Sequence, residues 1–441
     1  MSPAAGGRPR TVTVVGASLA GLYAARELRA QGFDGRLVVV GAEPHQPYDR
    51  PPLSKDFLTG TPDEARLALT DAEETAELAA EWLLGVRVRA LDARARTLVL
   101  DDGRTLPSDG VVIATGASAR RLPGPPLTGV YTLRTLDDAR ALRTALTTGS
   151  GPHRVVVIGG GFIGAETASS CVALGHDVTV VEAAPVPLAA PLGTEPALAC
   201  AGLHAGAGVR LLTGVGVTAL RSASRGTAAP DRVTSVELSD GRVLPADLVV
   251  VGIGATPNTD WLADSPLSLN DGVLCDDGCV TALPQVVAVG DVARAGGIRA
   301  EHWTNATQQP RVAVRNLLAG HTVETARPLP YFWSDQYGTR VQFAGRRREG
   351  DTVRVVEGAL EDPGEGFLAV YERAGRTVAA LAVGRSRPFM KLRRQLMADA
   401  GADPGTDIST GAGTSTDAET DGNADADTNT STDYKAEPAR I

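Results

Sequence analysis

Apolar strands and helical patterns alternate along the chain in an order that occurs twice. Residues 11–15 form a β-branched strand, a glycine-rich turn leads to a helical pattern at 22–30, and a second strand occupies 36–40. The same order returns about 143 residues later, at residues 154–158, 163–174 and 177–181. Strand, glycine turn, helix and strand open a doubly wound nucleotide-binding sheet. The pattern therefore predicts an α/β protein with two nucleotide-binding domains.

Further apolar strands complete this outline. Turns at residues 101–103 and 239–242 precede buried strands at 110–114 and 248–252, and one more strand follows at 283–289. After residue 328 the chain changes to short alternating strands, which predict a small α+β domain. Its expected strands and helix are residues 331–333, 341–345, 354–357, 367–371, 377–383 and 390–397.

These elements predict five parts. Residues 10–116 and 250–328 form the first nucleotide-binding domain in two pieces, with residues 117–249 between them as the second domain. Residues 329–398 form the C-terminal α+β domain. Residues 399–441 are rich in Thr, Asp, Ala and Gly, so burial cannot offset their ordering entropy. We expect that acidic tail to be disordered.

Composition narrows the setting and the partners. The 441 residues carry a net charge of −9, of which residues 403–441 hold −7, so the body is close to neutral. No apolar run reaches the about 18 residues that a membrane span needs, and residues 1–10 lack the apolar core of a signal peptide. Cys171, Cys200, Cys275 and Cys279 show no Cys-x-x-Cys pair or zinc spacing. We expect a cytoplasmic protein, monomeric or homodimeric, without bound metal and with neither nucleic acid nor membrane as a partner.

The first glycine loop reads Gly16-Ala17-Ser18-Leu19-Ala20-Gly21. A dinucleotide loop needs glycine at the tight turn, a small residue beside the pyrophosphate, and glycine where helix and strand meet. Gly16 and Gly21 meet the first and third needs, and Ser18 stands where the second glycine is usual. Glu43, some 27 residues after Gly16, is placed to bind a ribose hydroxyl. The alternative is a tight β–α turn without a ligand.

The second glycine loop, Gly159-Gly160-Gly161-Phe162-Ile163-Gly164, is complete, with a strand before it and a helix after it. Glu182 closes the next strand, 23 residues after Gly159. A carboxylate there accepts hydrogen bonds from the adenosine ribose and repels a 2′-phosphate. Residues 183–193 contain no Arg that could bind such a phosphate. The second domain is therefore predicted to bind NADH in preference to NADPH.

One long motif carries a family resemblance. Within residues 43–60, the run Pro47-Tyr48-Asp49-Arg50-Pro51-Pro52-Leu53-Ser54-Lys55 resembles the FAD-dependent ferredoxin reductases, which include putidaredoxin reductase and the reductases of aromatic-ring dioxygenases. Similar motifs follow in order at residues 114–116, 159–166, 289–291, 301–306 with Gln308, and 332–337. The resemblance covers about residues 10–395. It implies glutathione-reductase-like FAD and NAD domains, in that order, without a redox-active disulfide.

The resemblance also implies roles for charged residues. Lys55 would lie beside the flavin N5 and stabilise negative charge on the reduced ring, and Glu166 would pair with it where hydride crosses. Asp291, after Gly290, would accept hydrogen bonds from the flavin ribityl chain. Arg50 lies in the loop after Glu43, the acid that is predicted to bind the ribose at the first glycine loop. The alternative for Lys55 is an ordinary surface lysine.

Further FAD contacts follow from the same resemblance. Arg134 matches a position where the chain crosses between domains, and Val88 matches one whose backbone meets the adenine. Trp303 and Trp333 would lie near the isoalloxazine, or else are plain core aromatics. The remaining predicted cofactor contacts are Leu19, Ala20, Ala114, Thr115, Gly116, Gly161, Phe162, Ile163, Gly164, Gly252, Glu301 and His302.

The function that the resemblance implies is that of an FAD-dependent NAD(P)H:ferredoxin oxidoreductase. NADH would give hydride to FAD, and single electrons would pass to a small iron–sulfur ferredoxin that supplies a cytochrome P450 or a dioxygenase. Such ferredoxins are usually acidic, so a basic docking patch is expected. Clusters that fit, and that are equally explained as solvated arginines, are Arg346-Arg347-Arg348, Lys391 with Arg393 and Arg394, and Arg311 with Arg315.

Three other functions compete with this one. A disulfide or peroxide reductase needs a cysteine near the flavin, and we reject it because no cysteine precedes Cys171. A rubredoxin or quinone reductase is not separated from a ferredoxin reductase by the sequence. A flavoprotein that binds NADH without turnover and has a signalling role is disfavoured by Lys55, Glu166 and Glu182.

Overall fold

The computed structural model describes residues 8–60, 64–149, 151–223, 231–326 and 329–402. The described residues up to residue 400 form one compact unit. Residues 403–441, which hold most of the predicted disordered tail, lie outside the described residues.

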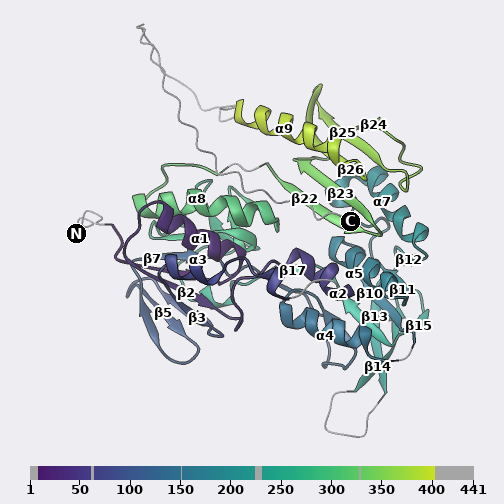
Figure 1. Cartoon of the computed structure of the whole chain (residues 1–441), viewed down its shortest axis with the longest axis horizontal. Helices are drawn as coiled ribbons and strands as arrows, with labels where there is room; N and C mark the ends of the chain where they lie inside the picture. Colours follow the sequence, from purple (N-terminus) through teal and green to yellow (C-terminus); the bar gives the residue numbers. More distant parts are fainter. Residues whose placement is uncertain (1–7, 61–63, 150, 224–230, 327–328, 403–441) are drawn as a thin grey trace. The chain divides into compact units, whose positions relative to one another are not determined.

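The first nucleotide-binding domain is built on a five-stranded parallel sheet (Figure 1). Val12, Val14 and Val39 are fully buried in it, because a parallel sheet covered on both faces needs continuous apolar strands. In spatial order its strands are β19 (Val286–Ala288), β7 (Gly110–Ile113), β1 (Thr11–Val15), β2 (Arg36–Gly41) and β3 (Ala80–Leu84).

Both faces of this sheet are covered. Helices α1 (Leu19–Ala30) and α8 (Trp303–Ala319) pack against each other on one face, and their apolar residues join its core. A small antiparallel sheet of β4 (Val88–Asp92), β5 (Thr97–Leu100) and β6 (Thr105–Pro107) covers the other face. The expected strand at 283–289 is shortened to β19, since Pro284 has no N–H to donate to a strand partner.

The second nucleotide-binding domain repeats the plan. Helices α4 (Leu136–Thr147) and α5 (Phe162–Ala173) pack on one face of another five-stranded parallel sheet. On its other face lies an antiparallel sheet of β13 (Val217–Ala223), β14 (Arg232–Leu238) and β15 (Val243–Pro245). In spatial order the parallel strands are β12 (Arg210–Leu212), β11 (Asp177–Val181), β10 (Arg154–Ile158), β16 (Leu248–Val251) and β9 (Val130–Thr132).

The predicted boundary between residues 249 and 250 is wrong. All of β16 pairs with β10 and β9 and so belongs to the second domain. The chain crosses between the domains at β8 (Ala117–Ala119) and returns at β17 (Ala255–Pro257), and these two short strands pair antiparallel. The crossings therefore define both boundaries.

The C-terminal domain is a five-stranded antiparallel sheet with one helix. One face packs on α6 (Ala189–Leu192) and α7 (Thr194–Gly206), and α9 (Ser386–Ala402) packs on the other face through Phe389. Helix α9 is longer than the expected helix at 390–397, so the predicted start of the tail at residue 399 is wrong. In spatial order the strands are β22 (Tyr331–Gln336), β23 (Thr339–Gly345), β26 (Arg376–Val383), β25 (Phe367–Arg373) and β24 (Thr352–Glu357).

Among the described residues, no helix has both the length and the apolar character that crossing a bilayer requires.

Shorter elements connect the layers of the three domains. The short elements are η1 (Pro51–Ser54), α2 (Asp56–Thr59), η2 (Glu64–Leu67), α3 (Ala72–Glu77), η3 (Asp260–Leu262), β18 (Val273–Cys275), η4 (Gly290–Val292), β20 (Ala293–Ala295) and β21 (Ile298–Arg299).

Candidate functional site

The first glycine loop joins β1 to α1 and has no room for side chains at its two glycines. Gly16 has a φ of +121°, and a Cβ there would lie 2.1 Å from the carbonyl oxygen of Ala114. A Cβ on Gly21 would lie 1.8 Å from the carbonyl oxygen of Gly16. Only glycine therefore lets α1 approach the strands this closely.

The second loop has the same geometry. A Cβ on Gly159 would lie 2.3 Å from the carbonyl oxygen of Gly252, and one on Gly164 would lie 2.0 Å from that of Gly159. Gly161, the residue before α5, differs because a Cβ there would meet nothing within 4 Å. Ser18 holds the corresponding place before α1. This open position explains how the first loop tolerates serine.

The two loops open into one cavity of about 1130 Å³. It brings together most of the predicted site residues, whereas Gly21, Gly159, Glu182 and Gly290 do not line it. The predicted residues that line it are Gly16, Ser18, Leu19, Ala20, Glu43, Arg50, Lys55, Val88, Ala114, Thr115, Gly116, Arg134, Gly161, Phe162, Ile163, Gly164, Glu166, Gly252, Asp291, Glu301, His302, Trp303 and Trp333.

A buried ion pair joins the two sides of the cavity. Lys55 Nζ lies 2.8 Å from Glu166 Oε2, and the Glu166 side chain is only 3% exposed. Ser54 donates a 2.5 Å hydrogen bond to Glu166 Oε2, and Ser334 of β22 donates one of 2.8 Å to Oε1. All three domains thus contribute to fixing one carboxylate, and its burial is compensated by these partners.

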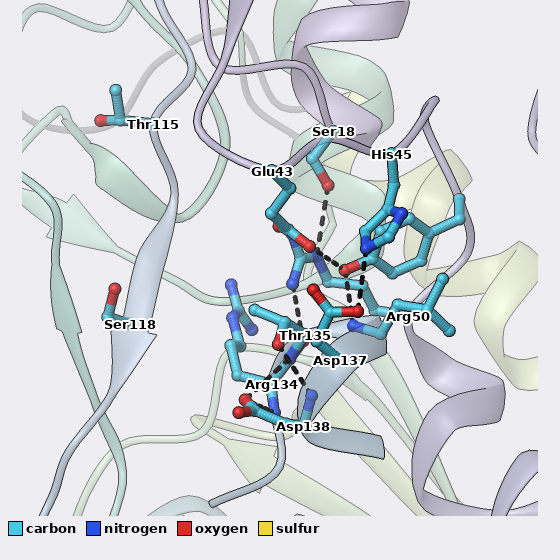
Figure 2. Close-up of polar contacts among 12 residues, drawn as sticks. Ser18, Glu43, His45, Arg50, Thr115, Ser118, Arg134, Thr135, Asp137 and Asp138 are labelled. Carbon is cyan, nitrogen blue, oxygen red and sulfur yellow. Dashed lines mark hydrogen bonds and ion pairs between the residues drawn. The ribbon is translucent and has the colours of Figure 1, made fainter. Parts of the chain in front are cut away.

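Glu43, the acid predicted to bind a ribose at the first glycine loop, lies in a polar cluster (Figure 2). Arg50 Nη2 lies 2.6 Å from Glu43 Oε1, and Tyr48 donates a 2.5 Å hydrogen bond to Oε2. Burial is the main cause that raises the pKa of Tyr48 well above its usual range, so the phenol stays a donor. Arg50 Nε also donates to Ser18 Oγ at 3.2 Å. The loop residue Ser18 and the acid are thereby held side by side.

Arg134 links the crossing segment to the end of the first sheet. Its Nη2 lies 2.6 Å from Asp291 Oδ2, and its Nε donates to the carbonyl oxygen of Ala117 in β8. Burial acts to lower the pKa of Arg134, but Asp291 outweighs it and raises the pKa overall. Figure 2 shows Arg134 beside Asp138, whose carboxylate accepts its backbone N–H. The crossing thus positions both Arg134 and Asp291 at the cavity.

Gly290 positions Asp291 from outside the cavity. A Cβ on Gly290 would lie 2.9 Å from Ala20 Cβ, and its N–H donates a 2.8 Å hydrogen bond to Gln309 Oε1 in α8. Gly290 therefore lets α1 approach closely while α8 fixes the turn that carries Asp291.

Aromatic rings form one wall of the cavity. Phe162 and Phe332 have centroids 4.6 Å apart, and Trp303 and Trp333 meet edge to face at 6.3 Å. Trp303 Nε1 donates to Asp49 Oδ1 at 3.3 Å. Burial raises the pKa of Asp49, against the effects of that hydrogen bond and of Lys55. The two tryptophans therefore lie in the cavity wall.

His302 precedes α8 and lies 5.5 Å from Phe332 between ring centroids. Burial lowers the pKa of His302, while Asp291 and Glu301 act in the opposite direction. The imidazole is therefore neutral around pH 7. It adds polarity to the aromatic wall without adding charge.

Glu182 acts on the second loop from the end of β11. Its Oε2 accepts the N–H of Gly160 at 2.7 Å, and its Oε1 accepts the N–H of Ala184 at 2.8 Å. The carboxylate therefore lies against the glycine loop without lining the cavity, and its role at the ribose stays a prediction. Which nucleotide it prefers stays a prediction.

Several cavity residues were not predicted from the sequence as site residues. Asp49 and Ser54 lie inside the quoted Pro47–Lys55 motif, so a signal for them existed. Phe332 lies in the 332–337 motif. Arg299 has no sequence signal, and it lines the cavity because β21 carries it there.

The basic clusters proposed for docking are partly neutralised or covered. Arg311 and Arg315 both pair with Glu324. Arg393 lies over the ring of Tyr331, with 4.1 Å between the guanidinium carbon and the ring centroid. The ion pairs with Glu324 reduce the net charge of the Arg311/Arg315 cluster, whereas the ring contact covers Arg393 without changing its charge.

The four cysteines are free thiols, and none of the described cavity-lining residues is a cysteine. Burial raises the pKa of Cys171 to about 12 and that of Cys200 to about 12. Both therefore stay protonated and unreactive at neutral pH. Disulfide chemistry at this cavity has no thiol to use in the described part of the chain.

Comparison with known proteins gives matches along nearly the whole chain. Residues 10–310 match the family described as pyridine nucleotide-disulphide oxidoreductase, and residues 331–410 match the one described as reductase C-terminal. The ferredoxin reductase component of chlorobenzene dioxygenase from Cupriavidus sp. (strain PS12) is 39% identical over 400 residues, which are 89% of this chain and 93% of that protein.

Two further proteins are similar to this chain over most of its length. The ferredoxin–NAD(+) reductase component of the anthranilate 1,2-dioxygenase system from Burkholderia cepacia is 38% identical over 88% of this chain and 95% of its own length. A chain of the covalent putidaredoxin reductase–putidaredoxin complex superposes with a TM-score of 0.81 and 32% identity, covering 88% of this chain and 93% of that one. These matches confirm the fold class and the resemblance that the sequence motifs indicate.

Proposed function

The chain belongs to the pyridine nucleotide-disulphide oxidoreductase family, and from this premise we propose that it is an NADH-dependent ferredoxin reductase that uses FAD. The observation that carries the proposal is the convergence of two glycine loops on one cavity, with the Lys55–Glu166 pair between its two sides. The relatives that are named ferredoxin reductases support it over most of the chain.

The residues present fit both dinucleotides. At the first loop, the bare backbone before α1 suits a pyrophosphate, and Glu43 and Asp291 offer carboxylates to ribose and ribityl hydroxyls. At the second loop, Gly161 and the N-terminus of α5 suit the pyrophosphate of NADH, and Glu182 suits its adenosine ribose. The two glycine loops have no space for side chains where the backbone must come close.

The chain's own residues then have definite tasks. Bound FAD supplies the conversion between a two-electron hydride and single electrons. Lys55 holds a positive charge in a place largely shielded from water, where it favours negative charge on a neighbouring ring. Glu166 and its serine partners keep that ammonium in place. Phe162 and Phe332 pack together in the cavity wall and would limit the access of water to bound nucleotides.

Electrons that enter this cavity must leave for another molecule. No cysteine lines it among the described residues, so an internal disulfide is not the acceptor. We infer that the acceptor is a small iron–sulfur ferredoxin that in turn supplies a dioxygenase or a cytochrome P450. We infer a cytoplasmic setting, because free buried thiols persist where the surroundings are reducing.

Anaerobic titration with NADH tests this function. NADH should bleach the flavin absorbance of the FAD-loaded protein. When a purified oxidised [2Fe–2S] ferredoxin is then mixed with the reduced protein, the flavin absorbance should return. Faster recovery with rubredoxin or a quinone would reassign the acceptor. A flavin that NADH does not bleach would leave a binding protein without turnover, and the reductase proposal would be lost.

A further inference from the structure

The NADH side of the cavity is built from a segment without cationic side chains. Between Arg154 and Arg210 the sequence holds neither Lys nor Arg, although this stretch includes the second glycine loop, α5 and Glu182. A dinucleotide brings two phosphate charges here. The N-terminus of α5 can compensate these phosphate charges only with backbone N–H groups and the partial positive charge of the helix dipole.

Four of the cations that line the cavity already have acidic partners. Each has a nitrogen within 2.8 Å of a carboxylate oxygen, so their charge is largely compensated. The pairs are Lys55 with Glu166, Arg50 with Glu43, Arg134 with Asp291, and Arg299 with Glu301.

Arg347 of the C-terminal domain lies on α6, next to the NADH side of the cavity, although it does not itself line the cavity. It lies in the turn between β23 and β24, and its Nη1 donates a 3.0 Å hydrogen bond to the carbonyl oxygen of Ala190 in α6. Pro191, the next residue of α6, lines the cavity together with Gly161 of the second loop. The half-buried Arg347 side chain lies on Gly193, where a Cβ would be 3.0 Å from its Nε.

Arg347 lacks an ion-pair partner among the residues that the structure describes. Its side chain donates a hydrogen bond to a backbone carbonyl. Asp351, an acid of the same turn, accepts two hydrogen bonds of 2.7 Å from Arg373, which are the main cause that lowers its pKa, and Arg347 adds a smaller electrostatic effect. A guanidinium has five N–H donors in a planar fork, which suits the oxygens of a phosphate.

We propose that Arg347 supplies the side-chain cation that binds the diphosphate of NADH. This proposal rests on the assignment of the second glycine loop to NADH. It gives the C-terminal domain a part in nucleotide binding, and it gives one arginine of the Arg346–Arg348 cluster a task other than docking a ferredoxin.

Calorimetric titration of the FAD-loaded protein with ADP-ribose tests the proposal, because this probe has the diphosphate and no nicotinamide. R347M keeps the aliphatic stem over Gly193 and removes the charge. Its Kd for ADP-ribose should rise about tenfold or more, the scale of one lost charge-assisted hydrogen bond, and R347K should recover part of the loss. FAD content and Tm check that each variant folds.

Arg348 provides a matched control. Arg348 is exposed, and its backbone N–H donates a hydrogen bond to Asp351, which the substitution keeps, so R348M should bind ADP-ribose like the unaltered protein. Rising NaCl should weaken ADP-ribose binding more steeply in the unaltered protein than in R347M. Adenosine, which has no phosphate, should inhibit NADH oxidation equally in both.

Four results would overturn the proposal. One is an unchanged Kd for ADP-ribose in R347M and R347K, and another is an equal loss of adenosine binding, which would indicate a change of shape. A weakened response to ferredoxin with normal ADP-ribose binding would assign Arg347 to docking instead. No ADP-ribose binding by the unaltered protein would overturn the NADH assignment together with this proposal.

Discussion

Replacing Lys55 by Met removes one charge from the buried ion pair and keeps most of the side-chain length. Lys55 Nζ lies 2.8 Å from Glu166 Oε2, and the two side chains are 16% and 3% exposed. Ser54 and Ser334 donate to the same carboxylate, so Glu166 stays hydrogen bonded when Lys55 is lost. K55M therefore tests the positive charge more than the position of the carboxylate.

The magnitude follows from the separation and the burial. At 2.8 Å and an effective dielectric constant of about 20, the Coulomb attraction is about 6 kcal/mol. Desolvation offsets much of it, and removing one partner of a buried pair costs about 3–5 kcal/mol. Because two serines remain, K55M should lose about 3 kcal/mol of unfolding free energy. Loss of the charge should slow flavin reduction by NADH about 100-fold.

Two assays measure these effects. Anaerobic stopped-flow absorbance gives the reduction rate and the NADH Kd in one concentration series, and the Kd should change little. Denaturant unfolding of K55M, E166Q and the double variant gives the coupling. Because the double variant leaves no unpaired charge, it should lose about 2 kcal/mol less than the two single losses added together. Lys391, an exposed lysine of α9, gives the matched control K391M.

An unchanged reduction rate in K55M with full flavin content would refute the placement of Lys55 at the reacting centre. Strictly additive losses in the double variant would refute the ion pair as an energetic unit. A normal rate of flavin reduction in K391M is required before a slow rate in K55M is assigned to the buried charge.

Glu182→Gln should narrow the kcat/KM preference for NADH over NADPH about tenfold, because the charge that repels a 2′-phosphate is lost; equal values in the unaltered protein would contradict the ribose argument. Gly164→Ala should abolish ADP-ribose binding while flavin content stays normal, since its Cβ would lie 2.0 Å from the Gly159 oxygen, and normal calorimetric binding would disprove that steric account. Burial lowers the pKa of His204 from 6.5 to about 4. The unfolded chain therefore takes up this proton first, so stability is full above about pH 6.5, falls by about 3 kcal/mol between about pH 6.5 and 4, and changes little further below pH 4. Denaturant unfolding of His204→Asn between pH 4 and 7 should show a flatter slope, and an unchanged slope would exclude His204 as the cause.

The sequence by itself determined both nucleotide sheets and their loops. The strands expected at 11–15 and 154–158 are β1 and β10 residue for residue. Strands buried on both faces are continuous apolar runs, and glycines forced by close backbone approach stand at fixed spacing, so both signals are local. The Pro47–Lys55 motif likewise indicated Arg50 and Lys55, which do line the cavity.

Errors arose where pairing partners are distant. The strand β16 looked like the start of the returning first domain, but its neighbours in space are β10 and β9. The end of α9 was placed too early, although Phe389 and Leu396 of α9 are both buried in the core that it shares with the C-terminal sheet. Local pattern shows that a face is buried and does not show what buries it.

Only the tertiary structure decided which side chains meet. Ser334 reaches Glu166 from 168 residues away, and Arg347 reaches Ala190 from 157 residues away. Neither contact leaves a periodicity or a spacing in the sequence, because each depends on how the C-terminal domain packs against the second domain. The glycine loops were therefore predictable from the chain alone, whereas the serines that hold Glu166 and the arginine on α6 became visible only in the folded protein.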